Sequence, residues 1–133
     1  MTLAQERRDA RERALGLLYE AETKGCSGTA LLEELPVPAD EFAAGLVTAV
    51  DEHKERIDSL ISEHAKGWTL SRMPALDRAA LRMGTAELIT RADVPTPVVL
   101  NETVELASRF STDDSGRFVN GLLARIAIEV RGE

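Results

Sequence analysis

The chain has 133 residues, of which 44% are hydrophobic, and its formal net charge is -7. This length suits one domain that buries a core without disulfides or a structural metal, and the single cysteine excludes an internal disulfide. The acidic balance excludes a protein that coats nucleic acid nonspecifically, because neutralising phosphates needs a dense basic surface. The charged first residues and the lack of a long apolar run predict a cytoplasmic protein with no signal peptide and no membrane span.

The amino-terminal half is predicted to form helices that glycine and proline separate. Apolar residues recur at helical spacing over residues 2–23, and Gly25 stops that first helix. Its apolar side comprises Leu3, Ala10, Ala14, Leu17, Leu18 and Ala21. A short helix is expected over residues 29–35, before a pair of prolines. Asp40 then caps a helical stretch toward Gly67 that is either one helix or two.

A broadly apolar helix follows. It is predicted to start near Pro74, where Ser71 can cap it. Its apolar residues are Leu76, Ala80, Leu81, Met83, Leu88 and Ile89. Because these residues surround the helix on nearly every side, we expect it at the centre of the protein.

The last two predicted helices are joined by a short polar turn. Thr96 precedes Pro97, which suits the first helical position, so the earlier helix is predicted to begin there and to end at Ser111. A cap at residues 112–114 precedes the later helix, where negative charge is favourable. The apolar stripe of that helix, which must be buried, comprises Ser115, Phe118, Val119, Leu122, Leu123, Ile126 and Val130. Gly121, in the interior of the later helix, predicts either a close contact with another helix or a packed neighbour at that point.

These segments predict an all-α protein, a helical bundle of about six or seven helices. No linker rich in Gly, Ser or Pro divides the chain, so residues 1–133 are expected to form a single domain. The natural division gives two packed subdomains of three to four helices, roughly residues 1–67 and 68–133. Trp68 stands at this boundary, and a wedge between the subdomains is favoured over the alternative, a platform for a ligand.

The sequence contains no pattern that is typical of a catalytic site. It has no phosphate-binding glycine loop and no dinucleotide fingerprint. His53 and His64 lack a cysteine or carboxylate cluster at ligand spacing, and Cys26 has no nearby histidine. We therefore expect no enzyme activity, no cofactor and no metal ligand.

Arginines crowd the start of the first helix. They are Arg7, Arg8, Arg11 and Arg13. A guanidinium can donate two parallel hydrogen bonds to a phosphate, which favours nucleic-acid binding. However, Glu6, Asp9 and Glu12 alternate with the arginines, and the charge pattern alone favours a solvated face with intrahelical ion pairs.

Four segments carry a resemblance to a known family. They are ARERALGLLYE, WTLSRMPALDRAALRMGTAEL, VPTPVVLNETVELA and DDSGRFVNGLL, in this order along the chain. Together they resemble the NusB family of bacterial transcription antitermination factors. The resemblance implies a helical adaptor that binds the boxA element of nascent ribosomal RNA together with NusE, a small-subunit ribosomal protein. It also implies that this assembly helps the RNA polymerase elongation complex to transcribe through terminators.

The resemblance also implies two sets of site residues. Those expected to bind RNA are Arg7, Arg8, Arg11, Arg117 and Phe118. Those expected to contact NusE are Tyr19, Asp77 and Asp114. From the residues alone, core packing is an equal prediction for Phe118. Asp77 is also explained as an acid in the first turn of a helix, and Asp114 as part of the acidic cap of the last helix.

Two other functions and one question of assembly stay open. The first alternative is a helical adaptor that binds only proteins. The second is a stand-alone relative of the RNA-binding domain of ribosomal RNA cytosine methyltransferases. The residues also leave open whether the chain forms a homodimer, which could cover the first helix and its arginines.

Overall fold

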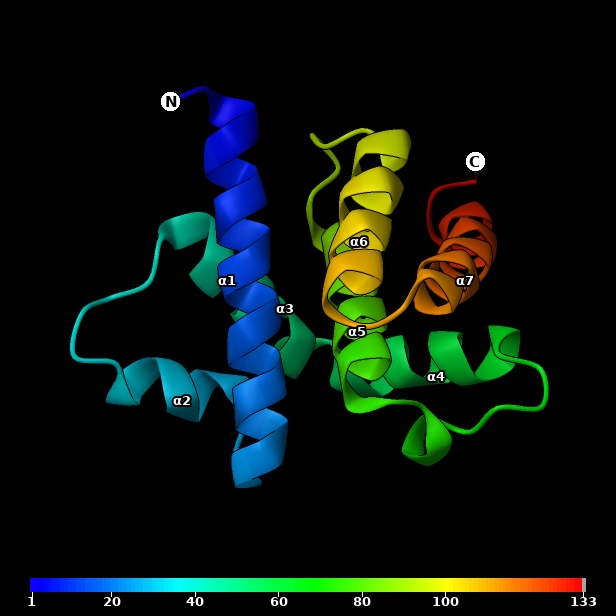
Figure 1. The fold of residues 1–133 in the computed structure, drawn as a ribbon, viewed down its shortest axis with the longest axis horizontal. Helices are drawn as coiled ribbons and strands as arrows, with labels where there is room; N and C mark the ends of the chain where they lie inside the picture. Colours follow the sequence, from blue (N-terminus) through cyan, green and yellow to red (C-terminus); the bar gives the residue numbers. More distant parts are fainter. Residues whose placement is uncertain (133) are drawn as a thin grey trace.

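A computed structural model describes residues 1–132, which form seven α-helices, one short 3-10 helix and no strand (Figure 1). The helices are α1 (Leu3–Lys24), α2 (Gly28–Glu34), α3 (Glu41–Glu52), α4 (Lys54–His64), η1 (Leu70–Arg72), α5 (Ala75–Thr90), α6 (Thr96–Phe110) and α7 (Asp113–Arg131). The predicted all-α bundle is confirmed. Within this described part of the chain, no helix combines the length and apolarity that crossing a membrane requires.

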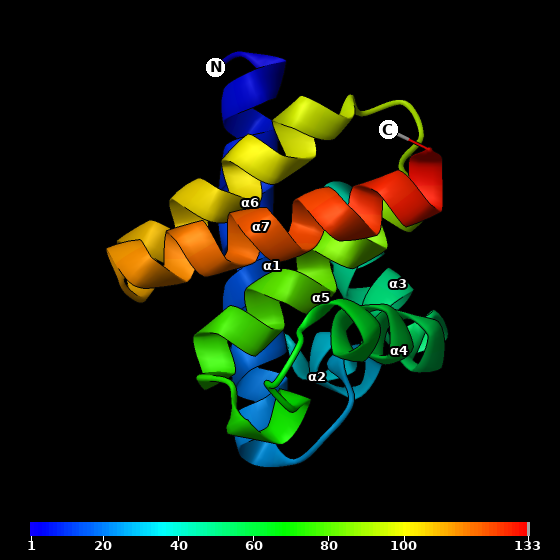
Figure 2. The ribbon, with the colours of Figure 1, turned by 90° about the vertical axis from the view of Figure 1, so that its right-hand side faces the viewer.

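Helix α5 lies at the centre, as its broad apolar surface predicts. It packs against α1, α3, α4, α6 and α7. Figure 2 shows α7 lying across both α5 and α6. Because α5 contacts helices from both halves of the chain, the division into subdomains at residues 67 and 68 stays a prediction.

Several helix ends follow from local capping. Thr2 and Gln5 form a reciprocal capping box at α1, and Asp40 accepts hydrogen bonds from two amides at the start of α3. Gly25 adopts the left-handed conformation that ends α1, with φ of 70°. The stretch after Asp40 is two helices, because the backbone turns at His53 between α3 and α4.

Two predicted caps were wrong. Ser71 lies in η1, and α5 begins after Pro74 without a side-chain cap. Thr96 is the first residue of α6 rather than its cap, and its hydroxyl accepts a hydrogen bond from Arg131 Nη1 at 3.1 Å. Both side chains carry a hydroxyl that could cap a helix, but in the structure neither hydroxyl caps the helix that follows it.

The predicted apolar faces are largely buried, but the predictions for Leu3 and Gly121 were wrong. Leu3 is 62% exposed because the first turn of α1 extends beyond the packed helices. Phe110, at the end of α6, is also exposed. Gly121 makes no close helix contact, since an added Cβ would meet only Arg125 Nη1 at 3.7 Å. The close approach on α7 is at Gly116, where a Cβ would lie 2.0 Å from Ser108 Oγ.

Alanine substitutions at these two glycines of α7 are expected to change the free energy of unfolding in opposite directions. We expect Gly116→Ala to lower the free energy of unfolding by about 1 kcal/mol, because overpacking against Ser108 outweighs the gain in helix propensity. Gly121→Ala has open space and should raise that free energy by up to about 1 kcal/mol. Urea unfolding of both variants measures the difference. Equal shifts would contradict the close approach between α6 and α7.

Candidate RNA- and partner-binding surface

Charged pairs link the arginine-rich part of α1 to α6. Arg8 Nε donates to Glu102 Oε1 at 2.9 Å, and Arg109 of α6 forms an ion pair with Glu12 of α1. The hydrogen bond that Arg8 donates to Glu102, together with the negative charge of that carboxylate, raises the pKa of Arg8 above its ordinary value. The acidic residues that pair with these arginines therefore come from both α1 and α6.

Arg7 belongs to a second charged cluster, next to the loop between α5 and α6. Arg7 Nη2 lies 3.7 Å from Asp93 Oδ2, and Arg91 donates to both oxygens of Asp93 at 3.0 and 2.8 Å. The Arg91 guanidinium lowers the pKa of Asp93 to about 2. Asp93 is thus an anion shared by two arginines.

Phe42 of α3 lies under this second cluster. The guanidinium carbons of Arg7, Arg11 and Arg91 lie 4.8, 5.2 and 4.7 Å from the centre of its ring. Cations at these distances are attracted to the face of an aromatic ring. Phe42 therefore helps to hold Arg7 in place, a role that the sequence analysis did not predict.

The structure corrects the prediction that Arg11 binds RNA. Arg11 is only 2% exposed, and it makes two hydrogen bonds of 2.8 and 2.6 Å to the buried carboxylate of Glu87 on α5. Arg11 lies on the buried side of α1, and its guanidinium pairs with an acid of the central helix. Arg11 is a structural residue, and no part of the accessible arginine surface.

Arg7 and Arg8 remain as the predicted RNA-binding arginines that solvent reaches. Their side chains are 27% and 58% exposed, and each already has an acidic partner. A phosphate that binds here must compete with Asp93 and Glu102. The arginine surface is thus accessible but neutralised in the free protein.

The turn before α7 carries another group of predicted site residues. Thr112 caps the helix by accepting from the Ser115 amide at 3.0 Å, which places Asp114 in the first turn. Asp114 and Arg117 are both highly exposed and form an ion pair. The half-buried Phe118 packs against Trp68, with ring centroids 6.0 Å apart.

A pocket of about 260 Å³ opens at this turn. Its lining residues are Trp68, Pro74, Asp77, Thr112, Asp114, Ser115 and Phe118. Trp68 is 51% exposed, so the prediction that it is a wedge between subdomains was wrong. Two aromatic side chains and the amino-terminal ends of two helices instead surround an accessible hollow.

Asp77 forms a polar part of this pocket wall. It is only 4% exposed, and its predicted contact with NusE stays a prediction. Its Oδ2 accepts from Ser115 Oγ at 3.0 Å, whereas its Oδ1 has no hydrogen-bond partner among residues 1–132. Since a buried polar atom without a partner is costly, this oxygen is suited to a donor that enters the pocket.

Tyr19 lies further along α1 and is exposed. It is 12 residues beyond Arg7 on the helix, a distance of about 18 Å. Tyr19 is therefore separate from the arginine clusters. Its predicted contact with NusE stays a prediction.

Several residues of this surface were not predicted from the sequence. Phe42, Asp93 and Glu102 neutralise or support the arginines, and Trp68 builds the pocket with Phe118. Glu102 lies within a motif that carries the family resemblance, but its partner Arg8 is 94 positions away. Nothing in the local pattern predicts such a pair.

The fold and this surface define a class: a small all-α binding protein, with accessible paired arginines and an aromatic pocket. Comparison with known proteins agrees. A family model described as the NusB family matches residues 8–128. The chain belongs to the NusB family.

Relatives of known function match most of the chain. The transcription antitermination protein NusB of Saccharopolyspora erythraea is 51% identical over 128 residues, which cover 91% of this chain and 86% of that protein. The same protein of Kineococcus radiotolerans is 49% identical, with 91% and 92% covered.

Solved structures agree with the fold as well. NusB of T. maritima superposes with a TM-score of 0.82 at 36% identity, covering 92% of this chain and 91% of that one. A crystal structure of the antitermination factors NusB and NusE in complex with double-stranded RNA gives a TM-score of 0.80 at 30% identity, with 97% and 99% covered. The fold is therefore the NusB fold.

Proposed function

We propose that this protein is a non-enzymatic, cytoplasmic transcription antitermination factor that binds boxA RNA together with NusE. Membership of the NusB family carries the proposal, and the structural relative in complex with both NusE and RNA supports it. The accessible pair Arg7 and Arg8 provides a surface for phosphates. The complex acts within the RNA polymerase elongation complex during transcription of ribosomal RNA.

When RNA binds to α1, Arg7 and Arg8 exchange their ion-pair partners. The carboxylates of Asp93 and Glu102 pair with Arg7 and Arg8 before RNA arrives. A phosphate group then replaces a carboxylate as the acceptor, and the guanidinium fork suits either group. Because exposed ion pairs contribute only about 0 to 1 kcal/mol, this exchange costs little.

The turn at α7 provides the second part of the surface. We assign base contact to Phe118 and phosphate contact to Arg117, which stands free of the core beside Asp114. Asp77 Oδ1 accepts a donor from NusE or RNA inside the pocket, and Asp114 and Tyr19 provide exposed contacts to NusE. A homodimer that covered α1 would hide Arg7, so the RNA-binding form is one in which α1 is uncovered.

The proposal predicts a loss of boxA binding when the two accessible arginines are removed. We expect Arg7→Ala/Arg8→Ala to weaken binding of a fluorescent boxA RNA by about tenfold, because two charged contacts are lost. Anisotropy titrations with and without NusE, against a scrambled RNA, measure this effect. Arg56→Ala/Lys66→Ala removes two exposed charges from α4 and its following loop and serves as the control.

The outcomes separate RNA binding from its main alternative. The neutralised arginines and the acidic chain favour an adaptor that binds only proteins as the second candidate. Equal binding of boxA and scrambled RNA by the wild type, with NusE still bound, would support that alternative. The curated relatives are antitermination proteins, which argues against a stand-alone relative of a methyltransferase domain.

Removal of a competing carboxylate should have the opposite effect. We expect Glu102→Gln to strengthen boxA binding by up to about fivefold, because Arg8 no longer has to leave an ion pair. Glu33→Gln removes the same charge from an exposed position of α2 and serves as the control. If both variants strengthen binding equally, net charge is responsible and the exchange of partners is wrong.

A further inference from the structure

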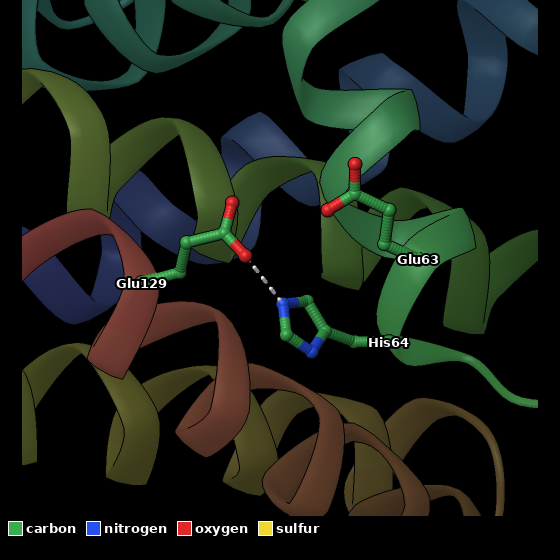
Figure 3. A group of neighbouring side chains, drawn as sticks. All are labelled: Glu63, His64 and Glu129. Atoms are coloured by element: carbon green, nitrogen blue, oxygen red, sulfur yellow. Dashed lines mark hydrogen bonds and ion pairs between the residues drawn. The ribbon is translucent and has the colours of Figure 1, made fainter.

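Three side chains with metal-binding atoms meet between α4 and α7. Figure 3 shows the carboxylates of Glu63 and Glu129 pointing toward one another beside the imidazole of His64. One ligand atom from each residue lies within 4.8 Å of the other two. His64 Nε2 and Glu129 Oε1 are 3.0 Å apart.

The fold holds these residues on two packed helices. Glu63 and His64 are the last residues of α4, and Glu129 lies in the final turns of α7. Arg125, one turn before Glu129, donates to the main-chain oxygen of His64 at 3.0 Å. This bond ties the end of α4 to α7, so the donor groups are positioned before any ion arrives.

The negative charges of the two glutamates in this cluster are only partly paired with other groups. Within residues 1–132, Glu63 has no hydrogen bond or ion pair, and Glu129 contacts only His64. The guanidinium of Arg125 is directed to a carbonyl rather than to either carboxylate. Two neighbouring carboxylates repel one another, and a bound cation would remove that repulsion.

We propose that Glu63, His64 and Glu129 form a binding site for a divalent transition-metal ion, with zinc as the best match. One imidazole nitrogen and two carboxylate oxygens, with water in the fourth position, are a donor set that zinc accepts. Magnesium and calcium prefer oxygen ligands alone, so the imidazole disfavours them. Tetrahedral ligands of zinc lie about 3.3 Å apart, a separation that small rotations of the two exposed glutamates provide.

The bound ion would cross-link α4 to α7. Glu129 and Asp114 lie at opposite ends of α7, a helix of 19 residues and so about 28 Å long. The metal site is therefore remote from the proposed contact of Asp114 with NusE and the proposed contact of Phe118 with RNA. Its effect is on the packing of two helices that are distant in the sequence.

Calorimetric titration of the metal-free full chain with zinc chloride tests the site. We expect one zinc ion per chain, with affinity lowered at least about tenfold in His64→Ala and in Glu129→Gln. Zinc should also raise the Tm of the wild type, and this rise should be lost in both variants. His53→Ala, which removes the only other histidine, and Glu33→Gln are the matched controls and should bind as the wild type does.

Several results would overturn the site. They are no zinc binding by the wild type, unchanged affinity in His64→Ala, or an equal loss in His53→Ala. Glu129→Gln retains an oxygen that can accept a hydrogen bond, so it keeps the fold while weakening the ligand. Binding of boxA RNA by the same variants should not change, which keeps failure of the metal site separate from failure of the proposed function.

Discussion

Replacement of Arg11 by alanine is expected to lower the free energy of unfolding by about 3 to 5 kcal/mol. Arg11 and Glu87 are both buried, and two hydrogen bonds join them across α1 and α5. Without the guanidinium, the carboxylate of Glu87 remains buried with no cation to balance it. That uncompensated charge, rather than the lost contact, accounts for most of the expected destabilisation.

Urea unfolding followed by circular dichroism measures this effect. Arg13→Ala is the matched control, because Arg13 is exposed on the same helix and makes no ion pair within the described residues. It should change the free energy of unfolding by less than about 0.5 kcal/mol. The double variant Arg11→Met/Glu87→Met removes both charges and should recover much of the lost stability.

A different result would restore the original prediction for Arg11. If Arg11→Ala were as stable as Arg13→Ala and yet lost binding to boxA RNA, Arg11 would be an RNA contact. In that case, the guanidinium of Arg11 would not be buried against Glu87 in solution. A variant that is destabilised but binds RNA normally when folded would confirm the structural role.

Phe118→Leu is expected to weaken boxA binding by about 1 to 3 kcal/mol, the range for loss of one base–aromatic stack. The half-buried ring lines the pocket and contacts Trp68. Leucine retains most of the apolar volume but has no aromatic face. The substitution therefore distinguishes two roles of Phe118, stacking on a base and packing in the core, which were equal predictions from the sequence.

The same titrations, together with Tm, measure the two roles. Phe110→Leu removes another exposed aromatic ring, at the end of α6, and serves as the control. A fall in affinity with an almost unchanged Tm, in Phe118→Leu alone, is the expected outcome. A lower Tm with unchanged affinity would assign Phe118 to packing, and an equal loss in Phe110→Leu would indicate a general effect of surface aromatics.

Local sequence was sufficient for most of the helices. Gly25 ends α1 because that position requires the left-handed backbone conformation, which glycine adopts readily. Thr112 caps α7 because its hydroxyl accepts a hydrogen bond from the amide three residues further on. The broad apolar surface of α5 likewise predicted a central helix. Caps and periodicity operate over a few residues, so they can be recognised without the fold.

The candidate site was only partly predictable for the same reason. The pattern around Arg11 allowed a solvated face or an RNA contact, and neither is correct, because its partner Glu87 is 76 positions away. Trp68 was expected between subdomains and instead lines a pocket with Phe118. Each error concerns a contact between segments that are distant along the chain.

By itself, the sequence determined the all-α class, the central helix and the resemblance to the NusB family. Only the tertiary structure decided which arginines of α1 are buried and which carboxylates neutralise the others. It also decided that Glu129, 65 positions from His64, lies beside that histidine. The physical reason is that helix formation depends on neighbouring residues, whereas burial and charge pairing depend on how the helices pack.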